Sequence, residues 1–265
     1  MADTSERFRL LVRVGYAARG LVYILLGYLG LSSAGEASAG PQATFDFLQQ
    51  VPLGSAVLYV VAIGLSAYAV YKFIAALGDV ENHGSDAKGV AHRIGYFASG
   101  LAHAVLAWAA FQFAWGDKRS SSGDGSEQAA VTLLACDLGT AVLGAIGIGF
   151  VAAAAFQARS AITAHFMRSV EAGVTSSICW IGRGGYAARA VVFLIIGWSL
   201  IRSAWIHDGA EVKGLGDALM SLRDAGALYT VVAIGLLMFG VFSLIVARFQ
   251  IIPPIDRHDL KPMFR

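Results

Sequence analysis

The chain has 265 residues, of which 57% are hydrophobic and 14% are charged, and its formal net charge is +2. A soluble domain carries about 25% charged residues, so this composition excludes a soluble globular protein of the same length. The apolar residues fall into six blocks, each as long as the 20 or so residues that a helix needs to cross a bilayer. The sequence therefore predicts an all-α integral membrane protein.

Six transmembrane helices are expected along the chain. Backbone groups in lipid must be paired within their own element, so apolar blocks of this length form helices. In chain order, the predicted spans are 14–33, 53–77, 94–115, 138–158, 185–206 and 226–247.

A short amphipathic segment is expected before the second, fourth and sixth spans, at 44–50, 128–136 and 215–223. These segments are expected to lie on the outer interface, each as a lid over a pair of spans. Asp137 and Asp224 follow two of them and occupy the places where the next helix needs an N-cap side chain.

The basic residues are distributed unevenly across the six-span topology. Of the 20 lysines and arginines, fifteen lie on the side that holds both termini. Cationic segments stay in the cytoplasm, so both termini are expected to be cytoplasmic. The five that fall on the other side are Lys118, Arg119, Arg202, Lys213 and Arg223.

The chain contains three tandem copies of one two-helix unit, within a single membrane domain over 1–265. The copies span approximately 13–78, 93–159 and 183–248, and the second helices repeat as well, at 54–64, 139–149 and 225–235. A unit with two crossings leaves every copy running in the same direction. Parallel repeats of this kind are related by an axis along the membrane normal, so we expect pseudo-threefold symmetry.

The head of each unit reads Arg-x-Gly-Tyr-x-Ala-x-Gly, beginning at Arg13, Arg93 and Arg183. This pattern resembles the bacterial membrane-protein family of domain of unknown function 1206, and the resemblance covers nearly the whole chain. It implies a multi-pass protein of the bacterial inner membrane and brings no activity, substrate or cofactor. The middle copy departs from the outer two at Phe97 and Ser99, and the third copy departs at Ala190.

Small residues recur seven positions apart in the first helix of each unit, a spacing that returns to one helix face. Small residues on one face let helix backbones approach closely in lipid, so we expect close helix contacts there. The pairs are Gly20 with Gly27, Gly100 with Ala107, and Ala190 with Gly197.

Basic and tyrosine residues stand where the first helix of each unit enters the membrane, and such residues anchor a span at the interface. The alternative is that the three arginines surround the axis and bind an anion or a lipid headgroup. These motif residues are Arg13, Tyr16, Arg93, Tyr96, Arg183 and Tyr186.

Arg19 and Arg189 lie about 9 Å deeper than the entry arginines, at about 1.5 Å per residue. A charge at that depth is costly unless it is paired or reaches back to the headgroups. We expect both side chains to reach back to the interface. The alternative is an anion pocket with Arg19 and Arg189 as ligands, whose threefold symmetry Ser99 breaks.

His103 is the ionisable residue nearest the predicted midplane, where the other copies have Tyr23 and Phe193. It is either a neutral imidazole hydrogen-bonded between helices or a functional group, since ionisable residues inside a membrane often mark function. Haem is excluded because His92 and His103 share one helix and the other histidines fall outside the spans.

The sequence carries no paired carboxylates, metal-ligand cluster or nucleophile set within its spans, so neither an enzyme nor a cofactor is expected. We expect a structural or accessory subunit of a membrane complex, with membrane lipids and other membrane-protein subunits as partners and no nucleic acid. The alternative is a small-solute or anion transporter or channel along the pseudo-threefold axis, which Arg19, Arg189 and His103 favour.

Overall fold

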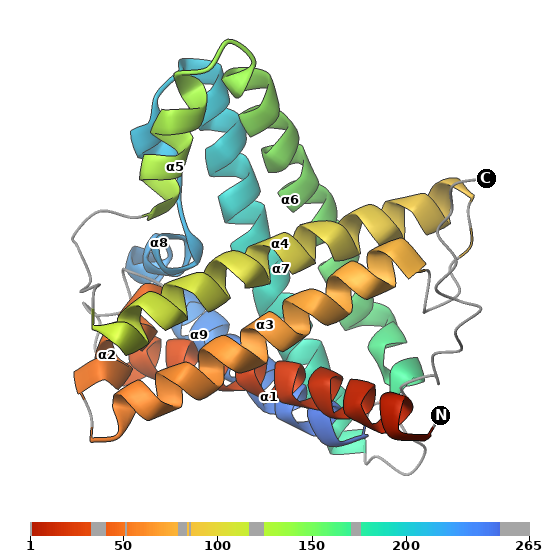
Figure 1. The fold of residues 1–265 in the computed structure, drawn as a ribbon. Helices are drawn as coiled ribbons and strands as arrows, with labels where there is room; N and C mark the ends of the chain where they lie inside the picture. Colours follow the sequence, from red (N-terminus) through yellow and green to blue (C-terminus); the bar gives the residue numbers. More distant parts are fainter. Residues whose placement is uncertain are drawn as a thin grey trace.

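The computed structural model describes residues 2–32, 41–50, 52–78, 84, 86–116, 125–170 and 176–249. In this part of the chain six helices are long and apolar enough to cross a membrane, which confirms the predicted all-α, six-span architecture (Figure 1). They are α1 (Ala2–Ser32), α3 (Gly54–Gly78), α4 (Ala87–Trp115), α6 (Gly139–Thr163), α7 (Ser176–Ile206) and α9 (Ala227–Phe249).

The first helix of each repeat begins 7 to 12 residues before its predicted span, because α1, α4 and α7 begin at residues 2, 87 and 176. Hydropathy marks only the part of a helix that lies in lipid, and these helices continue through a polar segment. For α4 the start is set by Asp86, whose carboxylate accepts a hydrogen bond of 2.8 Å from the Gly89 amide, the usual N-cap arrangement.

Three short α-helices confirm the predicted amphipathic segments: α2 (Pro41–Gln50), α5 (Gly125–Leu134) and α8 (Leu215–Met220). Single 3-10 turns, η2 (His165–Ser169), η3 (Gly209–Glu211) and η4 (Arg223–Ala225), complete the described connections. The predicted N-caps are wrong. A turn that joins the Gly139 amide to the Cys136 carbonyl (2.9 Å) moves the α6 cap to Leu138, past Asp137. Asp224 lies within η4, before α9 begins.

Helix α2 is packed among α1, α3 and α4. Phe45 is fully buried, with its ring centroid 6.0 Å from that of Phe113 on α4. The Gln49 amide donates a 3.1 Å hydrogen bond to the Phe113 carbonyl. Helix α2 therefore joins the first repeat to the second.

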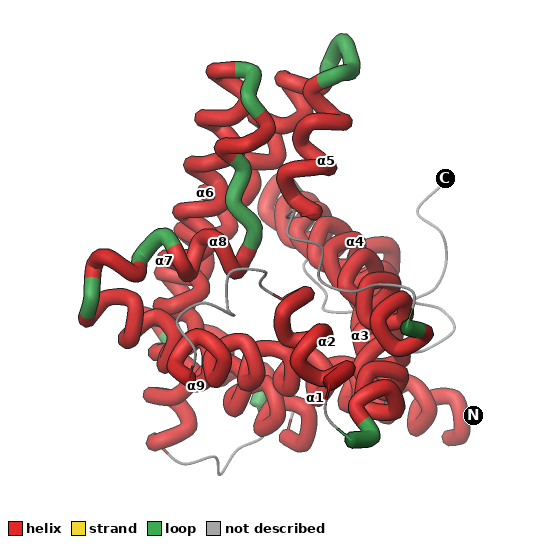
Figure 2. The backbone as a smooth tube through the Cα atoms, turned by 90° about the vertical axis from the view of Figure 1, so that its left-hand side faces the viewer, coloured by secondary structure: helices red, strands yellow, loops and turns green. Residues whose placement is uncertain are grey.

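The long helices contact one another in the open series α4–α3–α1–α9–α7–α6. The first helix of each repeat packs against the second helix of another repeat: α1 against α9, α4 against α3, and α7 against α6. Within the outer repeats, α1 also packs against α3, and α7 against α9. This order of contacts fits a pseudo-threefold arrangement, and it brings the first and last long helices of the chain together (Figures 1 and 2).

The predicted small-residue contacts are confirmed at the junctions between repeats. A methyl group at Gly20 would lie 2.8 Å from the Gly240 carbonyl oxygen, and one at Gly197 would lie 2.9 Å from that of Gly147. Real side chains do not approach backbone that closely, so these positions require glycine. The backbones of α1 and α9, and those of α6 and α7, are therefore in direct contact, the arrangement that small residues permit in lipid.

The middle repeat is open between its own two helices. Helices α4 and α6 belong to separate pairs, α3 with α4 and α6 with α7 (Figure 2). They meet where the rings of His92 and Phe156 lie edge to face, 5.6 Å apart. Only 22% of the apolar stretch of α4, and the same share of α6, is buried inside the protein, against 50% and 56% for α1 and α3.

Glycines at matching positions show the same difference. A methyl group at Gly15 or Gly185 would lie 2.8 or 2.6 Å from a backbone atom of the partner helix. Their counterpart on α4, Gly95, has nothing within 4 Å of that point, and neither has Gly149 on α6. The faces that join α1 to α3 and α7 to α9 are therefore uncovered on α4 and α6.

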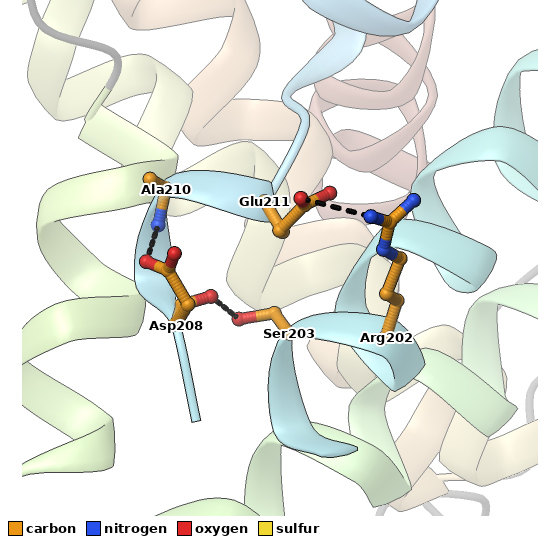
Figure 3. Close-up of polar contacts among 5 residues, drawn as sticks. All are labelled: Arg202, Ser203, Asp208, Ala210 and Glu211. Atoms are coloured by element: carbon orange, nitrogen blue, oxygen red, sulfur yellow. Dashed lines mark hydrogen bonds and ion pairs between the residues drawn. The ribbon is translucent and has the colours of Figure 1, made fainter. Parts of the chain in front are cut away.

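Polar contacts fasten the segment that follows α7 (Figure 3). The Ser203 hydroxyl donates to the Asp208 carbonyl at 2.5 Å, and the Asp208 carboxylate accepts from the Ala210 amide at 3.0 Å. Arg202 forms an ion pair with Glu211 at 3.2 Å. These contacts hold η3 beside the end of α7.

Candidate functional site

The Arg19 side chain points into the protein and does not reach back to the interface. Its exposed fraction is 9%. One guanidinium nitrogen donates a 2.6 Å hydrogen bond to the Tyr68 hydroxyl on α3, and another donates a 3.1 Å bond to the Ser243 hydroxyl on α9. The expectation of a snorkelling side chain is wrong for Arg19, because neighbouring helices supply polar partners at its own depth.

Aromatic rings enclose the same guanidinium. Its central carbon lies 4.6 Å from the ring centroid of Tyr16 and 5.0 Å from those of Tyr68 and Phe239. Cations are attracted to the faces of aromatic rings at such distances. Arg19 thus joins α1, α3 and α9 through both hydrogen bonds and ring contacts.

Arg189, the counterpart of Arg19 in the third repeat, is also turned inward. With its amide oxygen facing the guanidinium, the buried Gln157 side chain of α6 accepts hydrogen bonds of 3.1 and 3.2 Å from Arg189. The guanidinium carbon lies 4.3 Å from the ring centroid of Phe239 and 5.4 Å from that of Tyr23 on α1. Phe239 therefore contacts both arginines, and snorkelling is wrong for Arg189 as well.

The middle repeat carries Ser99 at the matching position of its first helix, and the cation comes from the facing helix instead. Lys72 on α3 has an exposed fraction of 7%. Its ammonium lies 4.3 Å from the ring centroid of Tyr96 on α4 and 4.9 Å from that of Tyr71. Ser99 therefore does not remove the positive charge from this junction, because Lys72 places one on its other side.

Lys72, Gln157 and Ser243 occupy one register of the three second helices, eight residues after Gly64, Gly149 and Gly235. All three are buried. Each junction between repeats therefore carries one inward-facing cation at this register, with Arg19 and Lys72 buried and Arg189 half-buried. We call the cations of the three junctions, Arg19, Lys72 and Arg189, the cation layer.

The sequence did not single out Lys72, Gln157 and Ser243, and Lys72 counted only among the fifteen basic residues on the side that holds both termini. The signal lies in the alignment of the second helices, which puts the three polar residues at one position. Only the packing order shows that each of them faces the arginine or serine of a different repeat.

Carboxylates do not balance the arginines of this layer. In the part of the chain that the structure describes, no Asp or Glu pairs with Arg19 or Arg189. The Nε atoms of both side chains are buried and have no hydrogen-bond partner. Among the described residues, the partners of these two guanidinium groups are therefore neutral.

His103 lies beside the cation layer. Its Nδ1 atom is 2.7 Å from the Ser99 carbonyl oxygen of its own helix, and its ring centroid is 4.5 Å from that of Tyr68. The predicted hydrogen bond between helices is thus replaced by one within α4. The Tyr68 hydroxyl in turn accepts a hydrogen bond from Arg19, so one residue separates the imidazole from that guanidinium. Both interpretations of His103 stay open.

The residues of the repeated motif differ in their surroundings. Arg93 donates to the carbonyls of Ala76 (2.6 Å) and Leu77 (3.3 Å), near the end of α3. Arg183 lies over the Trp180 ring at 4.9 Å. Tyr16 is buried, with its ring edge-on to Tyr68 at 5.1 Å, so its prediction as an interface anchor is wrong. A second aromatic ring on the neighbouring helix draws it inward.

The other two tyrosines of the motif also make ring contacts within the protein. Tyr186 stacks on Phe166 with ring centroids 4.7 Å apart, and Tyr96 lies under the Lys72 ammonium. Within the described residues, no three His, Cys, Asp or Glu side chains lie close enough to hold a metal ion.

The fold and this layer define a class: a multi-pass helical membrane protein made of three two-helix repeats, with one inward-facing cation at each junction between them. The chain belongs to the family described as Domain of Unknown Function (DUF1206), which matches residues 14–79, 94–164 and 184–250. This confirms the family resemblance of the repeated motif.

One relative of this chain is the Uncharacterized protein YxxB of Bacillus subtilis (strain 168). It is 32% identical to this chain over 261 residues, a match that covers 94% of the chain and 93% of the relative. No solved structure matches the chain.

Proposed function

We propose that this protein is a non-catalytic accessory subunit of a complex in the bacterial inner membrane, with both termini in the cytoplasm. Its middle repeat receives a transmembrane helix of a partner subunit between α4 and α6. The observation that carries the proposal is the pair Gly95 and Gly149, which have open space where their counterparts in the outer repeats contact a helix.

A helix is the occupant that these faces fit. In the outer repeats the same positions accept the neighbouring helix at backbone contact, as Gly15 does with Tyr68 and Gly185 does with Phe239. Close packing of small residues is a main source of helix association in lipid. A partner helix with small residues on one face would complete the contact that the middle repeat lacks.

Site-specific photocrosslinking in the host membrane tests the proposal. A photoreactive phenylalanine analogue at Gly149 should give a discrete adduct with one membrane protein after irradiation. The same analogue at Ile63, which is 66% exposed on α3, is the control and should give no such adduct. Gly149→Leu should then reduce co-purification of that protein without changing the unfolding temperature.

Two results would overturn the subunit role. One is a crosslink from position 149 to α4 of the same chain, which would mean that the middle repeat closes on itself. The other is a strictly monomeric species without any co-purifying protein in native mass spectrometry from a mild detergent.

The cation layer favours a second candidate, the transport of a small anion along the pseudo-threefold axis. The measurement is anion flux in liposomes that contain the purified protein. Transport predicts that Arg19→Ala combined with Arg189→Ala reduces the flux at least tenfold, while Arg202→Ala does not. Flux that is unchanged in the double variant would remove this candidate.

A further inference from the structure

We propose that Arg19, Lys72 and Arg189 together bind one oxyanion of the phosphate type, supplied either as free phosphate or as a lipid headgroup. The proposal goes beyond the subunit role and does not depend on a partner helix. The transport candidate, by contrast, would rest on it, since a transported anion must first be bound.

At one junction the cation comes from the opposite helix. Ser99 shows that the first helix accepts a neutral residue at this position, and Ser243 shows that the second helix does too. A junction that is neutral on both sides is therefore sterically possible. No junction has that combination, because the repeat that loses the arginine faces Lys72. This indicates that the layer needs three positive charges rather than a particular side chain.

Neutral groups surround the charges of Arg19 and Arg189. The partners of the two arginines are neutral hydroxyls, a neutral amide and ring faces. These groups accept hydrogen bonds but do not cancel the charge, and a buried charge without a counter-ion is unfavourable. An anion would supply the counter-charge that the described carboxylates do not provide.

The geometry of the guanidinium groups indicates which kind of anion they would bind. A guanidinium is a planar fork of donors that matches two oxygens of a phosphate or carboxylate. Arg19 and Arg189 contact the same Phe239 ring, and the Nε donor of each is buried without a hydrogen-bond partner. Three cations and two forks favour a multiply charged, multi-oxygen anion such as phosphate over chloride.

Equilibrium binding of ³²P-labelled inorganic phosphate to delipidated protein in a neutral detergent tests the proposal. The wild-type protein should bind phosphate in proportion to its amount, and unlabelled phosphate should displace it. Lys72→Met, which keeps side-chain length and removes the charge, should weaken binding at least tenfold. Arg202→Gln is the control, because Arg202 pairs with Glu211 outside the layer, and it should bind as the wild type does.

The decisive variant combines Lys72→Met with Ser99→Arg, which returns the cation to the same junction from the opposite helix. Phosphate binding should recover to within about threefold of the wild type. A purely structural role of Lys72 would not produce this recovery. If Lys72→Met does not give monodisperse protein, Arg189→Gln tests the same prediction at another junction.

The source of the anion is decided by a second arm. In native mass spectrometry of protein that has not been delipidated, a retained anionic phospholipid that is lost in Lys72→Met identifies the headgroup as the ligand. Phosphate binding without such a retained lipid identifies the free anion. Wild-type affinity in Lys72→Met or Arg189→Gln would overturn the proposal, as would the absence of both phosphate and phospholipid. Neither outcome bears on the photocrosslink at Gly149, so the two proposals fail separately.

Discussion

At the residue scale, the fold accommodates the buried guanidinium of Arg19 with neutral partners. Arg19 donates to two hydroxyls and lies among three rings, and this set joins three helices. A hydrogen bond to a charged group stabilises more than a bond between neutral groups. The Tyr68 hydroxyl is therefore expected to contribute to stability beyond the packing of its ring.

Tyr68→Phe should lower the free energy of unfolding by about 1–2 kcal/mol, since it removes an acceptor from a buried charged donor. The measurement is thermal or denaturant-induced unfolding in detergent. Tyr59→Phe on the same helix is the control, because the Tyr59 hydroxyl has no hydrogen-bond partner among the described residues, and it should leave stability unchanged. Equal stability of Tyr68→Phe and the wild type would show that this bond contributes nothing.

His103 offers a test that separates its two interpretations. Its ring packs on Tyr68, and its hydrogen bond is made within α4, so a ring of similar size should replace it. His103→Phe, which matches Phe193 in the third repeat, should unfold within about 0.5 kcal/mol of the wild type, while His103→Ala should lose about 2–3 kcal/mol of ring packing. Loss of phosphate binding in a stable His103→Phe protein would instead assign the imidazole a role in the site.

At the element scale, one sequence position has different surroundings in different repeats. Gly235 on α9 contacts Ala188 of α7, and Gly64 on α3 contacts Ala18 of α1. Gly149 on α6 occupies the same register and faces open space. All three repeats therefore have this glycine. Only in the first and third repeats does it contact the other long helix of the same repeat.

Gly235→Leu should destabilise the protein by about 1–3 kcal/mol, because the added side chain must separate two helices in contact. Gly149→Leu should have little effect on unfolding in detergent, because nothing lies within 4 Å of the new Cβ position. Both variants make the same change at the same register, so each serves as the control for the other. Equal destabilisation would show that α4 and α6 pack together in solution.

At the scale of the whole molecule, the contacts form a ring with one opening, between α4 and α6. Spin labels at Val105 and Val142 report the opening, and labels at Ile195 and Leu228 occupy the matching positions of the third repeat. In electron–electron resonance on protein in nanodiscs, the first pair should be clearly farther apart than the second. Equal distances would show that the ring closes in a bilayer.

Much of the architecture follows from the sequence, because apolar length, small-residue spacing and the repeated motif each act locally. The six long helices, the positions of the three amphipathic segments and the contact faces at Gly20 and Gly197 could all be predicted. The direction of Arg19 could not, because it depends on Tyr68 and Ser243, which are 49 and 224 residues away. The placement of Lys72 opposite the Ser99 position likewise depends on the packing of α3 of the first repeat against α4 of the second.

The contact of α1 with α9 makes Gly20 and Gly240 neighbours, although they stand near opposite ends of the chain. The opening in the ring of helices therefore lies within the middle repeat, between α4 and α6. It does not lie between the first and last helices of the chain. Two separately translated halves, divided between Trp115 and Gly125, would each contain three long helices and would share the α1–α9 junction. Such halves, when co-expressed, should assemble in the membrane and purify together, and Gly20→Leu should keep them apart.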